Sequence, residues 1–116
     1  MDDSNCIFCK IARKEIPSSI EYEDRQTLAF NDVNPKAPVH VLIIPKLHIA
    51  KISNIDEKSI GLLGKMAMVA NTIAKKRKIL DSGFRLIINC GKDSGQVVDH
   101  LHMHLLGGRQ LGWPPG

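Results

Sequence analysis

The stretch His100-Leu101-His102-Met103-His104-Leu105-Leu106 decides the fold of this chain. Polar and apolar side chains alternate along it, and successive side chains of a β-strand point to opposite faces of a sheet. We therefore expect a strand over residues 100–106, with the three histidines on one face and the side chains of residues 101, 103 and 105 on the other. The apolar face predicts packing against a core. The histidine face predicts a chemical site, because imidazole acts as a nucleophile, an acid, a base or a metal ligand near neutral pH.

Four shorter β-compatible runs precede this strand, over residues 20–23, 27–31, 40–44 and 84–89. The polar break at residues 24–26 predicts a hairpin between the first two runs. Residues 56–78 repeat apolar side chains at helical spacing, which predicts one long helix with Asp56 as its N-cap. A short helix is expected over residues 6–14, stopped by Pro17.

These elements predict an α+β fold, because strands and helices do not alternate regularly. We expect a mostly antiparallel sheet of about five strands, packed on one long helix, with a short N-terminal helix in addition. Leu101, Met103 and Leu105 should face the long helix. The whole chain, residues 1–116, is expected to form a single domain, with residues 1–5 flexible and residues 107–116 forming a C-terminal tail.

Composition excludes some classes of protein. The hydrophobic fraction of 43% and the charged fraction of 24% are typical of a globular protein rather than a disordered one. No apolar run approaches the roughly 18 residues needed to span a bilayer, and the first residues do not resemble a signal peptide, so a cytoplasmic protein is expected, with a nuclear pool possible for so small a chain. The net charge of +4 is compatible with a phosphorylated ligand, but neither a nucleic acid nor a membrane is expected as a partner.

The pair Cys6-Ile7-Phe8-Cys9 has the spacing of a metal-binding or redox-active motif. A disulfide framework is not expected, because the count of 3 cysteines is odd. Two cysteines combined with two histidines have the ligand count of a closed tetrahedral zinc site. A redox pair is the alternative, although the thioredoxin-like βαβ context is missing.

The sequence resembles the histidine-triad (HIT) family, whose pattern is His-x-His-x-His followed by two apolar residues. The resemblance extends over nearly the whole chain and includes Cys6-Ile7-Phe8-Cys9, Arg13-Lys14-Glu15-Ile16-Pro17, Phe30-Asn31-Asp32-Val33, Ala37-Pro38-Val39-His40, Ile44-Pro45-Lys46-Leu47-His48, Gly95-Gln96 and Gly107-Gly108-Arg109-Gln110. The tail Trp113-Pro114-Pro115-Gly116 is similar to that of the purine nucleoside phosphoramidase branch.

The resemblance implies a hydrolase that cleaves the P–N bond of purine nucleoside 5′-phosphoramidates. It assigns His102 as the nucleophile that forms a nucleotidyl-histidine, from which water releases a nucleoside monophosphate. His104 would stabilise charge on the phosphoryl oxygens, and His40 would support the orientation and protonation state of the nucleophile. A nucleophilic imidazole must be neutral, with its second nitrogen donating to a fixed acceptor, for which a main-chain carbonyl on the same strand would serve.

The resemblance also implies the nucleotide-binding residues. Asp32 would accept hydrogen bonds from ribose hydroxyls, and Asn89 and Gly95 would contact phosphate in a glycine-containing loop. The remaining expected nucleotide contacts are Phe8, Ile11, Ile16, Phe30, Asn31, Val33, Gln96, Val97, His102, His104 and Trp113. For Ile11 and Ile16 a simple core position is an equal alternative. Val97 departs from the branch, which usually has a hydroxyl residue there near the leaving group.

Family members with this cysteine pair imply a structural zinc ion held by Cys6, Cys9, His48 and His100. No organic cofactor is expected, and the family implies a homodimer in which the two sheets join. Three other functions stay open. A nucleotide-binding regulatory protein with weak turnover is compatible with Val97, whereas the tail argues against a dinucleoside polyphosphate hydrolase. A zinc scaffold is the third, although it would leave His102 and His104 without a function.

Overall fold

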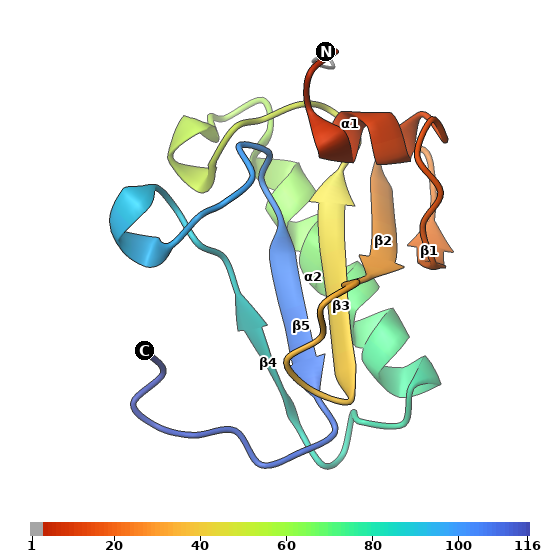
Figure 1. The fold of residues 1–116 in the computed structure, drawn as a ribbon, viewed down its shortest axis with the longest axis vertical. Helices are drawn as coiled ribbons and strands as arrows, with labels where there is room; N and C mark the ends of the chain where they lie inside the picture. Colours follow the sequence, from red (N-terminus) through yellow and green to blue (C-terminus); the bar gives the residue numbers. More distant parts are fainter. Residues whose placement is uncertain (1–3) are drawn as a thin grey trace.

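The computed structural model describes residues 4–116. Its elements follow one another as α1 (Ile7–Ala12), β1 (Ile20–Glu23), β2 (Thr27–Asn31), β3 (Val39–Pro45), a 3-10 helix (Ile52–Asn54), α2 (Ile60–Lys76), β4 (Phe84–Ile87), a second 3-10 helix (Lys92–Ser94) and β5 (Met103–Gly107) (Figure 1). The strands form one sheet in the order β1-β2-β3-β5-β4, and every neighbouring pair is antiparallel. The α+β fold expected from the sequence is confirmed.

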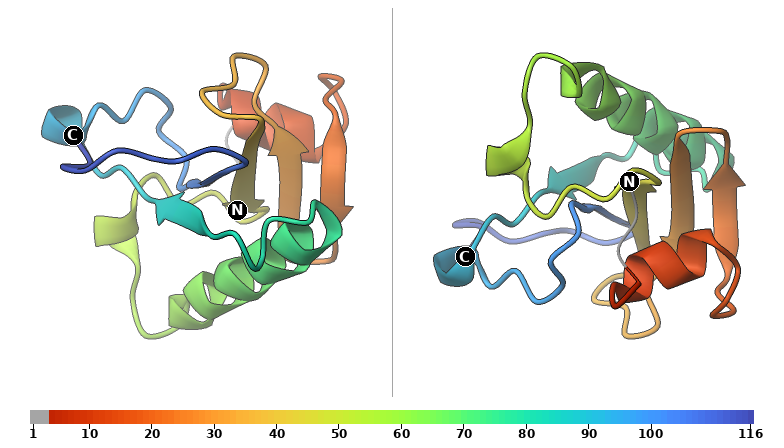
Figure 2. Two further views of the ribbon diagram at one scale, coloured as in Figure 1. Left: turned by 90° about the horizontal axis from the view of Figure 1, so that it is seen from below. Right: turned by 90° about the horizontal axis from the view of Figure 1, so that it is seen from above.

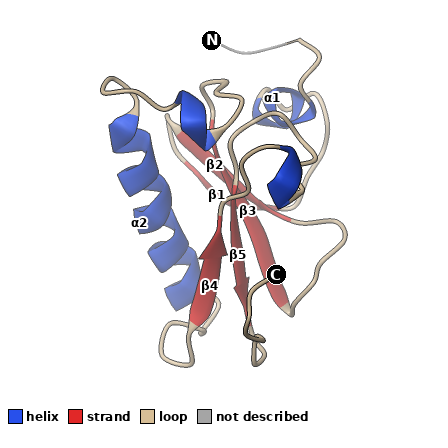
Figure 3. Ribbon diagram, turned by 90° about the vertical axis from the view of Figure 1, so that its left-hand side faces the viewer, coloured by secondary structure: helices blue, strands red, loops and turns tan. Residues whose placement is uncertain are grey.

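Helices cover both faces of the sheet. The long helix α2 lies against one face and α1 crosses the other, so that the sheet forms the middle layer (Figures 2 and 3). Strand β3 is buried along its whole length, because it lies in the centre of the sheet and between the two helices. The side chains of residues 101, 103 and 105 pack in the cluster that contains the buried face of α2, as expected from the alternation.

A second apolar cluster lies on the α1 face of the sheet. It joins Phe8 and Ile11 of α1 to residues at every second position of β2 and β3, namely Leu28, Phe30, Leu42 and Ile44. His40 and the triad histidines belong to this same face by the period of two. The face of the sheet that carries the histidines is therefore the face on which α1 packs.

The hairpin predicted at residues 24–26 is present, and Asp24 stabilises it. One carboxylate oxygen of Asp24 accepts hydrogen bonds from the backbone N–H groups of Gln26 and Thr27 and from the Thr27 hydroxyl, each at 2.8 Å. Such an Asx turn connects β1 to β2 without a glycine.

Both helices are shorter than the sequence predicts. The long helix begins at Ile60 with Ser59 as N-cap, so the prediction of Asp56 as the cap is wrong. The Asp56 carboxylate instead accepts from the backbone N–H groups of Lys58 and Ser59, each at 3.1 Å, which stabilises a separate turn before the helix. Helix α1 ends at Ala12 rather than residue 14, because Lys14 takes a left-handed conformation with φ 66°.

The terminal strand begins at Met103, so the prediction of a strand from residue 100 is wrong at its start. Other partners occupy the backbone groups there: the Leu101 N–H donates to the Ile49 carbonyl at 2.6 Å, and the His100 carbonyl accepts from the His102 ring at 2.7 Å. The neighbouring strand β3 ends at Pro45, which has no backbone N–H to donate to an extension of β5. Strand β4 ends at Ile87 rather than residue 89, at its last pair with β5.

The expected flexibility of residues 1–5 falls partly on residues 1–3, which lie outside the described residues. Ser4 and Asn5 form a turn before α1. Across residues 4–116, no helix has the length and hydropathy that a bilayer crossing requires.

Candidate functional site

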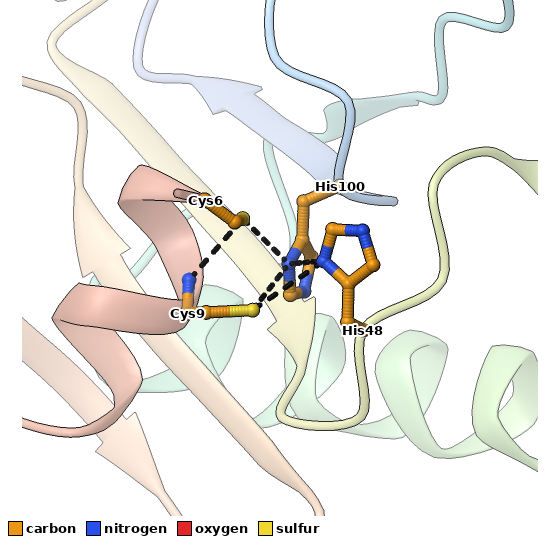
Figure 4. A group of neighbouring side chains, drawn as sticks. All are labelled: Cys6, Cys9, His48 and His100. Atoms are coloured by element: carbon orange, nitrogen blue, oxygen red, sulfur yellow. Dashed lines mark hydrogen bonds between the residues drawn. The ribbon is translucent and has the colours of Figure 1, made fainter. Parts of the chain in front are cut away.

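Two cysteines and two histidines from three parts of the chain meet at one end of the sheet (Figure 4). The Cys6 sulfur lies 3.2 Å from Nδ1 of His100, and the Cys9 sulfur lies 3.4 Å from Nδ1 of His48 and 3.6 Å from Nδ1 of His100. The two Nδ1 atoms lie 3.2 Å apart. All four ligand atoms are within 4.8 Å of one another.

These distances fit a tetrahedral zinc ion. Ligand atoms about 2.0–2.3 Å from a central zinc ion lie about 3.3–3.8 Å apart in a tetrahedron. Nε2 of His100 lies 2.8 Å from the Pro45 carbonyl, to which it donates, so the lone pair of this ring is on Nδ1 and points into the cluster. Burial lowers the pKa of His100 to about 4, which keeps the ring neutral and able to ligate. The cluster is consistent with a structural zinc site of the Cys₂His₂ type, as the sequence predicts.

The tautomer of His102 is fixed by the backbone. Its Nδ1 lies 2.7 Å from the His100 carbonyl, which can only accept, so Nδ1 carries the proton and Nε2 carries a lone pair. The ring is buried, and the Phe8 ring packs edge-on against it at a centroid distance of 5.2 Å. A main-chain carbonyl thus orients this ring, as a nucleophilic imidazole requires.

A second chain of hydrogen bonds fixes His40 and His104. The Lys36 N–H donates to Nδ1 of His40 at 3.0 Å, so the proton of neutral His40 is on Nε2. Nε2 of His40 lies 2.9 Å from Nδ1 of His104 and 3.4 Å from a carboxylate oxygen of Asp32, both of which are acceptors. The remaining proton of neutral His104 is therefore on Nε2, where it is available for donation.

Burial favours the neutral form of both rings. It lowers the pKa of His104 to about 4, with the nearby His102 and His40 adding to the effect. The pKa of His40 is also lowered, mainly by burial, although the Asp32 carboxylate opposes the shift. The hydrogen bond of His40 goes to His104, whereas the sequence analysis assigned its support to His102.

An apolar pocket of about 380 Å³ opens between α1, β2 and the segment before β5. Ten of the expected nucleotide-contacting residues line it: Phe8, Ile11, Ile16, Phe30, Asn31, Asp32, Val33, Val97, His102 and His104. We call it the nucleoside pocket, after the ligand that the family resemblance implies. Phe8, Ile11 and Phe30 also belong to the apolar cluster under α1, so they serve as core and as pocket wall at once.

A second cavity of about 440 Å³ lies beyond His104. It shares three residues with the nucleoside pocket, namely Asp32, Val97 and His104. We call it the distal pocket, and its other lining residues are Asn34, Lys36, His40, Ile87, Asn89 and Leu106. The predicted phosphate contact Asn89 lies here rather than in the nucleoside pocket.

Three predicted residues line neither pocket. Gly95 is exposed in the loop after the second 3-10 helix, in a left-handed conformation with φ 84°. The Gln96 side chain holds this loop, since it accepts from the Gly91 N–H and donates to the Ala50 and Val98 carbonyls. Trp113 is 80% exposed and lies 5.9 Å from the Arg85 guanidinium.

Several lining residues were not predicted from the sequence. Leu42 lies two positions after His40 on β3, so the period of two could have placed it on the pocket face. Lys36, Ile87 and Leu106 come together only through the strand order, because β5 pairs with both β3 and β4. No local sequence signal indicates that contact.

Fold and site together define a class of α+β proteins in which a buried histidine with a fixed tautomer faces an apolar pocket beside a Cys₂His₂ cluster. Residues 5–112 match the family model described as "Scavenger mRNA decapping enzyme C-term binding". The chain is 49% identical to the 14 kDa zinc-binding protein of Zea mays over 100% of this chain and 91% of that protein. It is 46% identical to Adenylylsulfatase HINT1 of Arabidopsis thaliana over 98% of this chain and 78% of the relative.

Solved structures agree with these matches. A HIT family hydrolase from Legionella pneumophila superposes with a TM-score of 0.95 at 47% identity, covering 97% of this chain and 100% of that one. The histidine triad nucleotide-binding protein from Candida albicans superposes with a TM-score of 0.80 at 40% identity, covering 95% and 83%. The chain belongs to the histidine-triad (HIT) family.

Proposed function

We propose that this chain is a nucleotide-binding hydrolase that cleaves the P–N bond of purine nucleoside 5′-phosphoramidates. The observation that carries the proposal is His102, whose Nδ1 donates to the His100 carbonyl while the ring lines the nucleoside pocket. A neutral ring with a directed Nε2 lone pair is the form in which imidazole attacks phosphorus.

The reaction proceeds in two displacements. Nε2 of His102 attacks the α-phosphorus, the P–N bond to the amine breaks, and the electron pair leaves with the amine nitrogen, which takes a proton. Water then attacks the same phosphorus and loses a proton to the solvent, the bond to Nε2 breaks with its electron pair returning to the ring, and the nucleoside monophosphate leaves. Splitting one difficult hydrolysis into two displacements is the benefit of a covalent intermediate.

His104 acts as a hydrogen-bond donor to the phosphoryl group. Its Nε2–H is directed outwards because Nδ1 accepts from His40. His40 has its Nδ1 occupied by the Lys36 N–H, so full transfer of the His104 proton would leave an unfavourable imidazolate. We infer that His104 stabilises charge and that the proton gained by the amine comes from water, because Val97 has no proton to donate.

The nucleoside pocket supports a purine ligand. Phe8, Phe30 and Ile11 offer apolar walls for a flat base, and the Asp32 carboxylate lies at the border of both pockets, where ribose hydroxyls can donate to it. In this arrangement the α-phosphate lies between His102 and His104, with Asn89 on the distal side.

We further propose that Cys6, Cys9, His48 and His100 hold a structural zinc ion, as the name of the Zea mays relative supports. Zinc would supply no redox chemistry here, since it is fixed in its oxidation state and all four positions are protein ligands. Zinc bound to the His100 ring would hold this residue in place, so that its carbonyl stays in position as the acceptor for the His102 ring.

A test of zinc binding has a matched control in the third cysteine. Metal analysis of the purified protein is expected to give about one zinc ion per chain, a value that Cys9→Ser abolishes and Cys90→Ser leaves unchanged. Cobalt substitution should show thiolate-to-metal absorption bands. Equal zinc content in the Cys9→Ser variant would reject this ligand set.

Hydrolysis of adenylyl sulfate is a second candidate function, because the Arabidopsis thaliana relative is named an adenylylsulfatase. The attack by His102 would be the same and sulfate would leave in place of the amine. Binding with weak turnover is the third candidate, favoured by Val97; in that case Val97→Ser should raise kcat by about tenfold or more.

The decisive experiment is to incubate the protein with adenosine 5′-phosphoramidate and follow adenosine monophosphate release. His102→Ala is expected to lower kcat on the order of 10³-fold or more, as loss of a nucleophile does, while still binding adenosine monophosphate. Intact turnover in this variant would reject the proposed nucleophile.

A further inference from the structure

The distal pocket adjoins the nucleoside pocket on the side where the leaving group of the proposed reaction would lie. It meets the nucleoside pocket at Asp32, Val97 and His104, so a phosphoryl group held at this border has the nucleoside on one side and the distal pocket on the other. Its walls are of two kinds. Ile87, Val97 and Leu106 are apolar, while Lys36, Asn34 and Asn89 are polar.

Lys36 is the cationic residue of this pocket. Its ammonium group makes no hydrogen bond or ion pair with other groups among residues 4–116, whereas its positive charge reaches His40 and contributes to lowering the pKa of that ring. The two histidines of the lining are neutral near pH 7, because burial lowers the pKa of each. Lys36 is therefore the unpaired positive charge that a ligand in this pocket meets.

The backbone of Lys36 is held in place from two directions. Its N–H donates to Nδ1 of His40 at 3.0 Å, and its carbonyl accepts from Nε and Nη2 of Arg109 at 3.2 and 2.8 Å. Gly108 permits the close approach of the tail, since a Cβ at this position would lie 2.9 Å from Pro38. The backbone of Lys36 is thus fixed beside the distal pocket, and its exposed side chain belongs to the lining.

The one acidic residue of the lining is already engaged. One carboxylate oxygen of Asp32 accepts from the Asn34 N–H at 2.8 Å, and the other lies 3.4 Å from Nε2 of His40. Asp32 also stands at the border with the nucleoside pocket, whereas Lys36 lines the distal pocket alone. Within the lining, Lys36 is therefore the cation that lies away from the border with the nucleoside pocket.

We propose that Lys36 selects substrates whose leaving group carries a negative charge, such as a carboxylate-bearing amine or an oxyanion like sulfate. This inference rests on the proposed function. A charge-assisted hydrogen bond from the ammonium to the departing group holds the substrate in line with His102 and favours anionic over neutral leaving groups.

The experiment compares two amines of almost the same shape. Adenosine 5′-phosphoramidates of glycine and of glycinamide have leaving groups of similar size that are anionic and neutral, respectively, and adenosine 5′-phosphosulfate provides the oxyanion. For each protein variant, the ratio of kcat/KM for the anionic compound to that for the glycinamide compound is measured. The variants are Lys36→Met, Lys36→Arg and, as a control for loss of an exposed lysine outside both pockets, Lys92→Met.

We expect Lys36→Met to lower the ratio about three- to tenfold, Lys36→Arg to restore it and Lys92→Met to leave it unchanged. Added salt should reduce the preference. A loss confined to the glycine compound identifies a carboxylate as the recognised group, and a loss confined to the phosphosulfate identifies the oxyanion. A ratio that Lys36→Met leaves unchanged for both compounds overturns the proposal.

Binding separates this proposal from the proposed function. The dissociation constants of the glycine and glycinamide compounds for His102→Ala, measured by calorimetry, give the same ratio without turnover. If the wild-type chain hydrolyses none of the compounds, the proposed function fails, and the ratio of dissociation constants with and without Lys36→Met still decides the role of Lys36.

Discussion

Each of the three triad histidines has one ring nitrogen held by a different hydrogen-bond partner. His100 donates from Nε2 to the Pro45 carbonyl, His102 donates from Nδ1 to the His100 carbonyl, and His104 accepts at Nδ1 from His40. In the proposed function, these three identical side chains serve as a metal ligand, a nucleophile and a hydrogen-bond donor. The difference comes from the group that meets each ring, because an imidazole with one nitrogen occupied has a defined tautomer.

Protonation of His104 is expected to destabilise the folded protein. Burial lowers its pKa from 6.5 to about 4, so between these values the unfolded chain binds a proton that the folded chain does not. The free energy of unfolding should therefore fall as the pH drops from about 6.5 to about 4. His104→Asn keeps an acceptor for His40 without a titratable ring.

Urea unfolding at pH 7 and pH 5 measures this effect. We expect the loss of stability between the two pH values to be smaller in His104→Asn than in the wild type. Zinc contributes to both proteins alike, whereas the coupling of His104 to His40 and His102 is part of the measured difference. An equal loss in the two proteins would contradict the role assigned to the buried ring.

At the scale of elements, β5 carries the site on one face and the core on the other. Leu105 is fully buried against the α2 cluster, while His104 and Leu106 point to the pocket side. The antiparallel pairing of β5 with both β3 and β4 fixes this register, and a slip by one residue would exchange the two faces.

Truncation of two neighbouring side chains on β5 should lower the free energy of unfolding by different amounts, because they lie on opposite faces of the sheet. Leu105→Ala is expected to lower the free energy of unfolding by about 2–5 kcal/mol, because it leaves a cavity in the core. Leu106→Ala should cost about 1 kcal/mol or less, since the side chain is only half-buried. Chemical denaturation of both variants provides the measurement, and equal losses would argue against this register.

At the scale of the whole molecule, β4 forms an edge of the sheet. Leu86 on this strand is 38% exposed, and the tail lies beside the same strand, where Arg85 donates to the Gly112 carbonyl at 2.9 Å. An edge strand with an exposed apolar side chain can pair with another strand. We propose that two copies of the chain join here, as the family resemblance implies, and that the tail with Trp113 then reaches the partner.

Sedimentation velocity tests this assembly. The chain of 12.9 kDa is expected to sediment as a dimer at micromolar concentration, and Leu86→Lys should shift it towards monomer by placing a charge at the edge. Far-UV circular dichroism serves as the control for folding. A monomeric wild-type protein would contradict the proposal.

Local pattern was sufficient for much of the fold and site. The alternation at residues 100–106 assigned the two faces of β5, and the polar break at residues 24–26 located the hairpin. Family motifs located the cysteine–histidine cluster and most of the nucleoside pocket. Element ends were less well predicted: Asp56 stabilises a turn of its own, and the backbone groups near His100 bond to loop and ring instead of a neighbouring strand.

Residue type and period are local properties, so the candidate histidines and cysteines could be named from the sequence alone. Only the tertiary structure decided the role of each nitrogen atom and the partner of His40. It also brought Lys36 to the distal pocket, beside Ile87 and Leu106. The physical reason is that tautomers and pocket walls depend on the groups a side chain meets, and those groups come from strands that are neighbours in the sheet but distant in the chain.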